Sequence, residues 1–393
     1  MYAVLAAAVN HPNAVAPQNS LFNERICRAL ADTGALSDAV SPRPVAPPVG
    51  PFSEYSDLPR VEPWGPYTVH RPSFYYLLPK RLFYAASGDS YARRVPAYVE
   101  EHLEVPDVVH ACHAYMDGYG MLPYCREHEV PLFSVVHGTV VNGYESLPPG
   151  VAPKVKETLE ASTVCCVSDA LNEKVRSIVD HDRVHTVALG ADPARFPTDR
   201  REELRTGFGV PADAPLLLFV GAYTEAKGVD DLLAALSGLP ETDGPDPYVA
   251  FVGHGGDRRE RLERWLADSR FEGRVHWKLD PETVAEWFAA ADLLVLPSHG
   301  EGRPTVVYEA MASETAVLAT TVGGIPEQVA DHETGRLVPP RDPRTLRDTL
   351  AAMLADPEAL AEMGHEGRAR LEREGWTWAG HAARLRELHE AVL

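Results

Sequence analysis

The fold is decided by the stretch Ser298-His-Gly-Glu301-Gly-Arg-Pro-Thr-Val-Val-Tyr-Glu309-Ala-Met-Ala. It follows a short apolar run, residues 292–297, whose composition is typical of a buried parallel strand. A polar, glycine-bearing loop comes next, and an apolar-periodic segment from about Thr305 predicts a helix. This order of strand, loop and helix places the loop at the carboxyl edge of a sheet, where open α/β folds bind their ligands.

Two carboxylates belong to this stretch, Glu301 in the loop and Glu309 within the predicted helix. The exposed amides at a helix start favour an anionic ligand, whereas carboxylates accept hydrogen bonds from hydroxyl groups. A ligand that carries both phosphates and hydroxyls, such as a nucleotide sugar, would satisfy the whole stretch.

Length and charge limit the possible functions. A chain of 393 residues is long enough to bury two α/β cores. Its 57 acidic and 37 basic side chains give a net charge of −20, which argues against general nucleic-acid binding. The five cysteines are odd in number and lack metal-type spacing, so we expect buried, reduced thiols and neither a disulfide framework nor a metal site.

The positive charge is almost all arginine, since lysine occurs only at positions 80, 154, 156, 174, 227 and 278. An acidic, lysine-poor composition resembles that of proteins from salt-accumulating halophiles such as haloarchaea. The self-repulsion of such a surface is screened in strong salt, where the Debye length is about 3 Å at 1 M. We therefore expect a halophilic cytoplasm, with an ordinary acidic protein from a GC-rich genome as the alternative.

The first residues, 1–9, are better explained by a β-strand than by a signal peptide, because no basic region precedes the apolar run. No apolar run approaches the roughly 20 residues that a membrane span requires. We expect a cytoplasmic protein.

Short apolar strands alternate with helices through the first half of the chain, which predicts a parallel sheet with right-handed crossovers. A glycine-free polar loop is expected over residues 10–20, and an amphipathic helix over about Leu21 to Asp32. Residues 41–70 are rich in proline and predict a surface excursion.

Residues 71–94 are positively charged, in contrast to the chain as a whole. This stretch contains five basic side chains, several aromatic ones and one acidic residue, Asp89. One interpretation is peripheral contact with an anionic or lipid-linked acceptor at the inner face of the cell membrane. The other is an aromatic helix that packs on the sheet and has solvated basic ends.

We divide the chain into two α/β domains, residues 1–195 and 215–375. The charged stretch 196–214 is expected to link them. The last segment, 376–393, is expected to be an amphipathic helix.

The assembled motifs resemble the retaining glycosyltransferases of family 4, the glycosyl transferases group 1, which have the GT-B fold. The strongest match is Glu301 with seven residues to Glu309, followed by Ala-Met-Ala and Val322-Gly-Gly-Ile-Pro-Glu327. The other matching motifs are Pro106-Asp-Val-Val-His110, Val136-His137-Gly138, Val167-Ser168, Leu189-Gly190-Ala191-Asp192, Phe219-Val-Gly221, Lys227-Gly228 and Val252-Gly253-His-Gly255. The resemblance implies two facing Rossmann-like domains, a nucleotide sugar between them, and a final helix that returns to the first domain.

The resemblance also implies roles for individual residues. Glu301 would contact the donor-sugar hydroxyls, and Glu309 the ribose hydroxyls. Lys227 would hold the diphosphate together with backbone amides around Gly302 to Thr305, a segment that includes Pro304, while Gly221 and Gly253 would form turns near the nucleotide. His137 would face the sugar from the first domain. A nucleotide sugar is then the co-substrate, and no metal or other cofactor is expected.

Two departures from the family pattern affect the donor site. Ala222 stands where the family commonly has the arginine that accompanies the lysine on the diphosphate, and Arg303 stands where an aromatic or aliphatic residue is usual. Our hypothesis is that Arg303 replaces the missing arginine; the alternative is that it points into solvent. The glycine-free first loop also lacks the Gly-Gly pair that is common near the donor phosphate.

The leading interpretation is an enzyme that moves a sugar to an acceptor hydroxyl of a surface polysaccharide, lipid-linked glycan or glycoprotein glycan. The main alternative is a degenerate module that binds a nucleotide sugar or a partner without turnover. A sugar-nucleotide epimerase has less support, because the spacing of the two glutamates is transferase-like. His110 and His113 resemble a metal pair only superficially, and we interpret both as structural.

Overall fold

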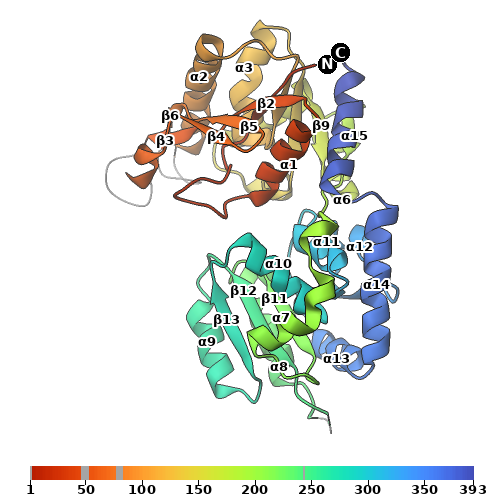
Figure 1. Ribbon diagram of the computed structural model, residues 1–393. Coiled ribbons are helices and arrows are strands. Elements are labelled where there is room, and N and C mark those ends of the chain that lie inside the picture. Colours follow the sequence, from red (N-terminus) through yellow and green to blue (C-terminus); the bar gives the residue numbers. More distant parts are fainter. Residues whose placement is uncertain (1, 46–52, 77–82, 242–243) are drawn as a thin grey trace. The chain divides into compact units, whose positions relative to one another are not determined.

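The computed structural model describes residues 2–45, 53–76, 83–241 and 244–393 (Figure 1). The chain forms two compact units, which are treated separately below. Unit 1 comprises Met1–Ala188 and Trp378–Leu393, and unit 2 comprises Leu189–Thr377. The terminal helix α15 (Trp378–Glu390) thus belongs with the first half of the sequence, and packs on the first helix, α1 (Leu21–Asp32).

Unit 1 contains an eight-stranded sheet in the order β10-β9-β8-β7-β1-β2-β5-β4. All neighbours are parallel except β4 and β5. Its strands are β1 (Val4–Ala7), β2 (Leu36–Val40), β4 (Val61–Trp64), β5 (Tyr67–His70), β7 (Val108–Ala111), β8 (Leu132–Val136), β9 (Thr163–Cys166) and β10 (Val184–Thr186). A separate parallel pair joins β3 (Arg43–Val45) to β6 (Ser73–Tyr75).

The α-helices of unit 1, besides α1 and α15, are α2 (Tyr84–His102), α3 (Tyr119–Glu127), α4 (Thr139–Asn142), α5 (Val151–Ala161) and α6 (Asp169–Arg176). The predicted amphipathic helix agrees with α1 at both ends. The expectation that 41–70 is only a surface excursion is wrong for its described part, because Tyr67 and Val69 of β5 are buried in the sheet. These short strands were not predicted because the many prolines of this stretch interrupt the strand pattern.

Unit 2 contains a six-stranded, wholly parallel sheet in the order β13-β12-β11-β14-β15-β16. Counted from the start of the unit this is 3-2-1-4-5-6, the doubly wound Rossmann order. The strands are β11 (Leu216–Val220), β12 (Tyr248–Gly253), β13 (Gly273–Trp277), β14 (Leu293–Leu296), β15 (Ala316–Thr320) and β16 (Gly335–Val338). The strand order reverses between β11 and β14, which is the switch point of the sheet.

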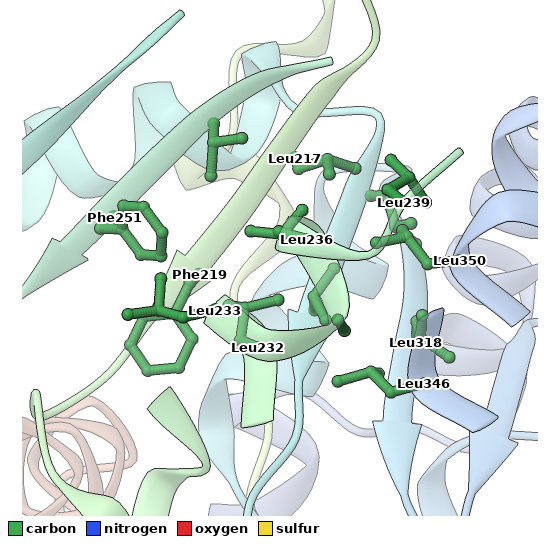
Figure 2. Packing of buried hydrophobic residues seen from close by; sticks show 14 of the residues in the cluster. Leu217, Phe219, Leu232, Leu233, Leu236, Leu239, Phe251, Leu318, Leu346 and Leu350 are labelled. Carbon is green, nitrogen blue, oxygen red and sulfur yellow. The ribbon is translucent and has the colours of Figure 1, made fainter. Parts of the chain in front are cut away.

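Helices cover this sheet and supply much of the core. They are α7 (Arg201–Phe208), α8 (Val229–Ser237), α9 (Arg259–Asp268), α10 (Pro281–Ala290), α11 (Thr305–Ala312), α12 (Ile325–Gln328), α13 (Pro343–Leu354) and α14 (Pro357–Arg373). Figure 2 shows Leu232 and Leu236 of α8 packed with Phe219 of β11 and Leu350 of α13, all buried. Each such side chain contributes about 1.5–3 kcal/mol of transfer free energy, so this cluster fixes α8 on the sheet beneath the loops of the switch point.

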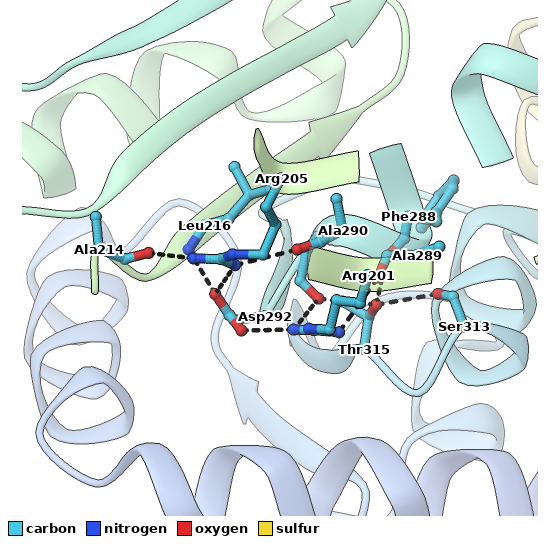
Figure 3. A network of polar contacts seen from close by, with 11 residues as sticks. Arg201, Arg205, Ala214, Leu216, Phe288, Ala289, Ala290, Asp292, Ser313 and Thr315 are labelled. Carbon is cyan, nitrogen blue, oxygen red and sulfur yellow. Dashed lines mark hydrogen bonds and ion pairs between the residues drawn. The ribbon is translucent and has the colours of Figure 1, made fainter. Parts of the chain in front are cut away.

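The expectation that residues 196–214 form a linker is wrong. They contain α7, whose Arg201 and Arg205 bind the Asp292 carboxylate at 2.5 and 2.8 Å (Figure 3). Asp292 also accepts a hydrogen bond from the backbone N–H of Leu216 at 2.7 Å. The two arginines lie one helical turn apart and tie α7 to the starts of β11 and β14, so the charged pattern belongs to a packed helix of unit 2.

None of the helices in the described ranges combines the length and the apolar character needed to cross a bilayer.

Candidate active site

The predicted donor residues of unit 2 meet at its switch point. Residues 221–227 follow β11, residues 298–303 follow β14, and the two strands are hydrogen-bonded neighbours. Because both loops leave the carboxyl edge of a parallel sheet, they lie where such folds bind ligands.

The centre of this site is an ion pair. Lys227 Nζ lies 2.6 Å from Glu301 Oε1, and the Ser298 hydroxyl donates to the same oxygen at 2.6 Å. Ser298 is fully buried and the Glu301 side chain is 9% exposed, whereas the Lys227 side chain is 31% exposed. The Glu301 carboxylate is therefore held by the buried Ser298, and Lys227 is the more accessible member of the pair.

Further contacts hold the two loops together. The backbone N–H of His299 donates to Ala226 O at 2.9 Å, and the His299 ring contacts the Asp231 carboxylate at 2.7 Å. Gly228 has φ +69°, and a Cβ there would lie 1.9 Å from Pro297 O. Only glycine permits this approach, so the Lys227-Gly228 motif is what allows the lysine loop to close on the end of β14.

The Val322-Gly-Gly motif supports the glutamate loop from the other side. Gly324 N–H donates to Gly302 O at 2.7 Å. Gly323 has φ +54°, and a Cβ there would lie 2.0 Å from Glu301 O. The family-like glycines are thus packing requirements of the loop that carries Glu301.

Helix α11 begins directly after this loop. Pro304 precedes it and accepts a hydrogen bond from Gln328 Nε2 at 3.1 Å, while no side chain in the described ranges caps the helix start. The amides from Gly302 to Thr305 therefore lie at the positive end of the helix dipole. Glu309 lies about one turn further along, and its side chain is half-buried.

Gly221 follows β11, and Gly253 ends the neighbouring strand β12. A Cβ on Gly253 would lie 2.1 Å from Gly221 O, and a Cβ on Gly221 would lie 3.9 Å from Lys227 Cδ. The absence of side chains at these two positions lets the backbones approach and leaves space beside the lysine stem.

Arg303 is buried, which excludes the alternative that it points into solvent. Its side chain is 5% exposed, and Nη1 lies 3.2 Å from Glu327 Oε2. The guanidinium carbon lies 4.9 Å from the centre of the Trp376 ring and 5.7 Å from that of Tyr308. Arg303 thus links the glutamate loop to Trp376, in the segment before α15. The predicted donor role of Arg303 did not include these packing and ion-pair contacts.

Unit 1 has its own switch point, between β1 and β7. Here the backbone N–H of Val9 donates to Asp117 at 2.8 Å, and the His113 ring contacts the same carboxylate at 3.0 Å. Asp117 is fully buried, and burial raises its pKa even though these contacts oppose the shift. A buried acid therefore joins the first loop to the loop after β7.

His137 follows β8, close to this group. Its Nε2 donates to Cys112 O at 3.0 Å, and its ring centre lies 4.5 Å from that of Phe22 and 5.3 Å from that of His113. Burial lowers the pKa of His137 well below its usual range, so the ring is neutral and Nδ1 is its acceptor. His137 thus has a fixed tautomer.

The structural interpretation fits His110, which is buried and packs on His389. It is incomplete for His113, whose ring is oriented by Asp117 and lies beside His137. The spacing of four residues between His113 and Asp117 was the available signal, but a turn of irregular helix after β7 made it difficult to interpret.

Comparisons with known proteins agree with this geometry. The family model of "Glycosyltransferase Family 4" matches residues 23–195, and that of "Glycosyl transferases group 1" matches residues 200–370. A D-inositol 3-phosphate glycosyltransferase of Xylanimonas cellulosilytica is 33% identical over 297 residues, which cover 70% of each chain. A putative teichuronic acid biosynthesis glycosyltransferase of Bacillus subtilis, TuaC, is 27% identical over 86% of each chain.

Solved structures show the same fold. The chain resembles sucrose-phosphate synthase from Thermosynechococcus elongatus with a TM-score of 0.82 and 22% identity, covering 100% of this chain and 99% of that one. It resembles Anabaena HepE, solved in complex with UDP-glucose, with a TM-score of 0.72 and 16% identity over 100% of both chains. The predicted GT-B fold, with a parallel sheet in each of two domains, is confirmed. The chain is a glycosyltransferase and belongs to glycosyltransferase family 4, the glycosyl transferases group 1.

Proposed function

We propose that this enzyme transfers a sugar from a nucleoside-diphosphate sugar to an acceptor hydroxyl, with retention of configuration at the anomeric carbon. The observation that carries the proposal is the Lys227–Glu301 pair at the switch point of unit 2, where a cation for phosphates adjoins a carboxylate for hydroxyls. The likeness in fold to HepE, whose structures contain UDP-glucose or UDP, supports a nucleotide-sugar donor.

The donor is proposed to lie along the edge that carries both loops. Its diphosphate binds Lys227 and the backbone N–H groups of Gly302, Arg303 and Thr305 at the start of α11, its ribose hydroxyls bind Glu309, and its sugar hydroxyls bind Glu301. Gly221 and Gly253 supply close backbone contacts, and Arg303 adds positive charge. His137 of unit 1, neutral and with Nδ1 as acceptor, is proposed as a further catalytic residue.

The reaction breaks the bond between the anomeric carbon and the distal phosphate oxygen, and negative charge grows on the departing diphosphate. Lys227 and the helix-start amides stabilise that charge. Because the charge is larger in the transition state than in the bound donor, this interaction lowers the activation barrier. The acceptor oxygen attacks from the same face of the sugar, and its proton passes to the departing phosphate oxygen. Atoms and charge then balance without a protein nucleophile.

This arrangement is proposed to need no divalent metal, because a lysine and a helix dipole provide the positive charge. Turnover that survives dialysis against EDTA is the expected result. Loss of turnover with EDTA, restored by Mg²⁺ or Mn²⁺, would contradict this part of the proposal.

The acceptor is proposed to be a hydroxyl of a surface polysaccharide, a lipid-linked glycan or a glycoprotein glycan. The names of the curated relatives, which include a D-inositol 3-phosphate and a teichuronic acid glycosyltransferase, agree with hydroxyl-rich acceptors of cell-envelope type. We further propose that the enzyme works in the cytoplasm at the inner face of the membrane, contacting it through residues 71–94. Part of that stretch, residues 77–82, lies outside the described residues.

The test is a panel of UDP-, GDP- and ADP-sugars, scored by thermal shift and by release of nucleoside diphosphate in the presence of myo-inositol 3-phosphate. Donor binding must raise the melting temperature by mass action. Lys227→Ala should abolish the shift, whereas Lys174→Ala, which removes an exposed lysine bound to Asn142, should preserve it. A panel with no shift for any nucleotide sugar in the wild-type enzyme would contradict the proposal.

A further inference from the structure

A concave site lies on unit 1, at the side of its sheet that carries β4 and β5. It is a hollow of about 400 Å³ between α2 and the strands β4 to β6, here called the basic hollow. Figure 1 shows α2 beside β6. The side chains with charge that line it are Arg60, Arg71, Arg93, Arg94 and Glu101. Four guanidinium groups thus meet one carboxylate in a chain whose net charge is −20, so solubility does not explain the cluster.

Arg71 is the buried, preorganised residue of this hollow, because only 1% of it is exposed. One terminal nitrogen binds Glu62 at 2.8 Å and approaches Pro12 O at 3.5 Å. Its Nε is buried and has no hydrogen-bond partner among the described residues. A buried guanidinium with an unpartnered donor is a fixed positive charge in the wall of the hollow, and it adds to the attraction for an anion bound there.

The other three arginines are exposed, and none makes an ion pair within the described ranges. Arg94 is nevertheless positioned, since its Nε donates to Ser73 O at 2.8 Å and its guanidinium lies 5.0 Å from the centre of the Tyr75 ring. These two contacts hold the guanidinium group in place and do not use its terminal nitrogens as hydrogen-bond donors. Arg93 precedes it on α2, and the backbone of Arg60 is hydrogen-bonded to that of Arg71 at 2.7 Å.

We propose that the basic hollow binds a phosphate group, either a monoester or a diester. Guanidinium groups bind phosphate oxygens through paired N–H donors, and several converging forks select a multiply charged tetrahedral anion over a single carboxylate. The group comes either from a soluble phosphorylated compound or from the headgroup of a phospholipid. The site is separate from the Lys227–Glu301 pair and does not depend on the donor chemistry proposed above.

Within residues 71–94, phosphate binding would then depend on a few side chains of the basic hollow. Arg71, Arg93 and Arg94 of that stretch contribute to the hollow, and Arg60, which lies outside the stretch in sequence, completes it through the pairing of β4 with β5. A defined pocket rather than a diffuse basic surface is then the functional unit.

The experiment uses the full-length enzyme and the double variant Arg93→Gln/Arg94→Gln, which changes only exposed side chains of α2. The control is Arg176→Gln/Arg384→Gln, which removes the same charge from exposed positions of unit 1 outside the hollow. Inorganic phosphate is titrated by calorimetry at constant ionic strength, with saturating UDP present. In a second arm, the proteins are sedimented with vesicles of phosphatidylcholine alone or with added phosphatidylglycerol.

We expect the hollow variant to lose about tenfold or more in phosphate affinity, a change of about 1.4 kcal/mol, and the control to match the wild type. Phosphate binding without vesicle binding identifies a soluble source, and vesicle binding that needs phosphatidylglycerol and Arg93/Arg94 identifies a headgroup. Absence of binding in both arms, or equal losses in the hollow and control variants, overturns the proposal. Circular dichroism of each variant checks that the fold is intact.

Discussion

The ammonium nitrogen of Lys227 lies 2.6 Å from Oε1 of Glu301, so in the ligand-free protein the two charges of the proposed donor site neutralise each other. A diphosphate must attract the lysine away from this carboxylate, and it also meets the negative charge of Glu301 nearby. If the proposed donor site is correct, the pair should restrain binding of the nucleoside diphosphate product, for which UDP is the probe below, because this product lacks the sugar hydroxyls that would satisfy Glu301 when the lysine leaves it.

The first prediction follows from this competition. Glu301→Gln should bind UDP more tightly than the wild type, by about three- to tenfold, because the lysine is released and the repulsion removed. The same variant should lose about 100-fold or more in sugar transfer, because a neutral amide replaces the carboxylate that accepts the charge-assisted hydrogen bonds of the sugar hydroxyls. Calorimetry with UDP and a transfer assay measure the two effects.

Ser298→Ala provides the companion variant, since it removes a hydrogen bond to Glu301 but retains both charges. It should leave UDP affinity near that of the wild type. Weaker UDP binding by Glu301→Gln would show that the carboxylate positions the lysine for phosphate rather than competing with it.

A second prediction concerns the glycine beside the lysine. Gly228→Ala should destabilise unit 2 by about 3 kcal/mol or more, since the new methyl group would overlap Pro297 O at 1.9 Å in addition to the strain of φ +69°. Gly375→Ala is the matched control, because Gly375 has φ +63° but no atom of the described residues lies within 4 Å of the place its Cβ would take. The control should cost only about 1 kcal/mol. Similar losses in urea unfolding for both variants would show that Pro297 moves aside freely.

The strand, loop and helix around Glu301 could be predicted from sequence because all their determinants are local: an apolar run, a glycine-bearing loop and a helical period. The pairing of Lys227 with Glu301 was not predicted, although both residues were identified. It depends on β11 and β14 being neighbours, which is a property of strand order.

The misses have the same origin. Residues 196–214 have the composition of a linker, but contacts with residues far along the chain, such as Asp292 and Trp287, pack residues 201–208 as a helix of unit 2. Asp117 orients His113 because the chain turns irregularly after β7, whereas the spacing alone fits an ordinary exposed helix equally well. Contacts between residues far apart in sequence, or across irregular backbone, leave no periodic signal.

The third prediction concerns Arg303 and uses substitutions that separate its proposed role in donor binding from its role in packing. Arg303→Met retains the apolar stem beside Trp376 and Tyr308 but loses the charge and the contact to Glu327. If the guanidinium also supports the donor phosphates, UDP affinity should fall by about tenfold. Stability should fall as well, by about 1–3 kcal/mol, since Glu327 and the aromatic rings lose a partner.

Glu327→Gln is the control, because it weakens the same ion pair while leaving Arg303 charged. It should lower the melting temperature but preserve UDP affinity. If Arg303→Met binds UDP as the wild type does, the hypothesis that Arg303 replaces the arginine missing at Ala222 is wrong.

The fourth prediction tests the proposed adaptation to salt. With a net charge of −20, unfolding should be strongly salt-dependent, and raising KCl from about 0.1 M to about 1 M shortens the Debye length from about 10 Å to about 3 Å. The melting temperature should rise by about 2–5 °C over this range, as about 1–2 kcal/mol of repulsion is screened. A melting temperature that is flat between these concentrations would contradict a halophilic origin.

The last prediction concerns the helix that joins unit 1 from the end of the chain. His381 of α15 is buried, its Nδ1 donates to Ala188 O at 2.8 Å, and burial lowers its pKa to about 4. An unfolded histidine has a pKa of about 6.5, so the unfolded state takes up a proton first as the pH falls. The stability of unit 1 should therefore be constant above about pH 6.5 and be lost progressively between about pH 6.5 and 4. At pH 5 the loss from this residue is about 2 kcal/mol.

Urea unfolding at pH 7.5 and 5.0 in constant KCl measures this loss. His381→Gln should start less stable at pH 7.5, yet lose about 2 kcal/mol less than the wild type on acidification, because the titrating group is gone. His365→Gln changes a ring that is 68% exposed and should retain the full pH dependence. The other buried histidines of unit 1, whose pKa values burial also lowers, contribute to the dependence that remains in His381→Gln; they are His11, His110, His137 and His389. An unchanged pH dependence in His381→Gln would mean that α15 separates from unit 1 before this ring meets acid.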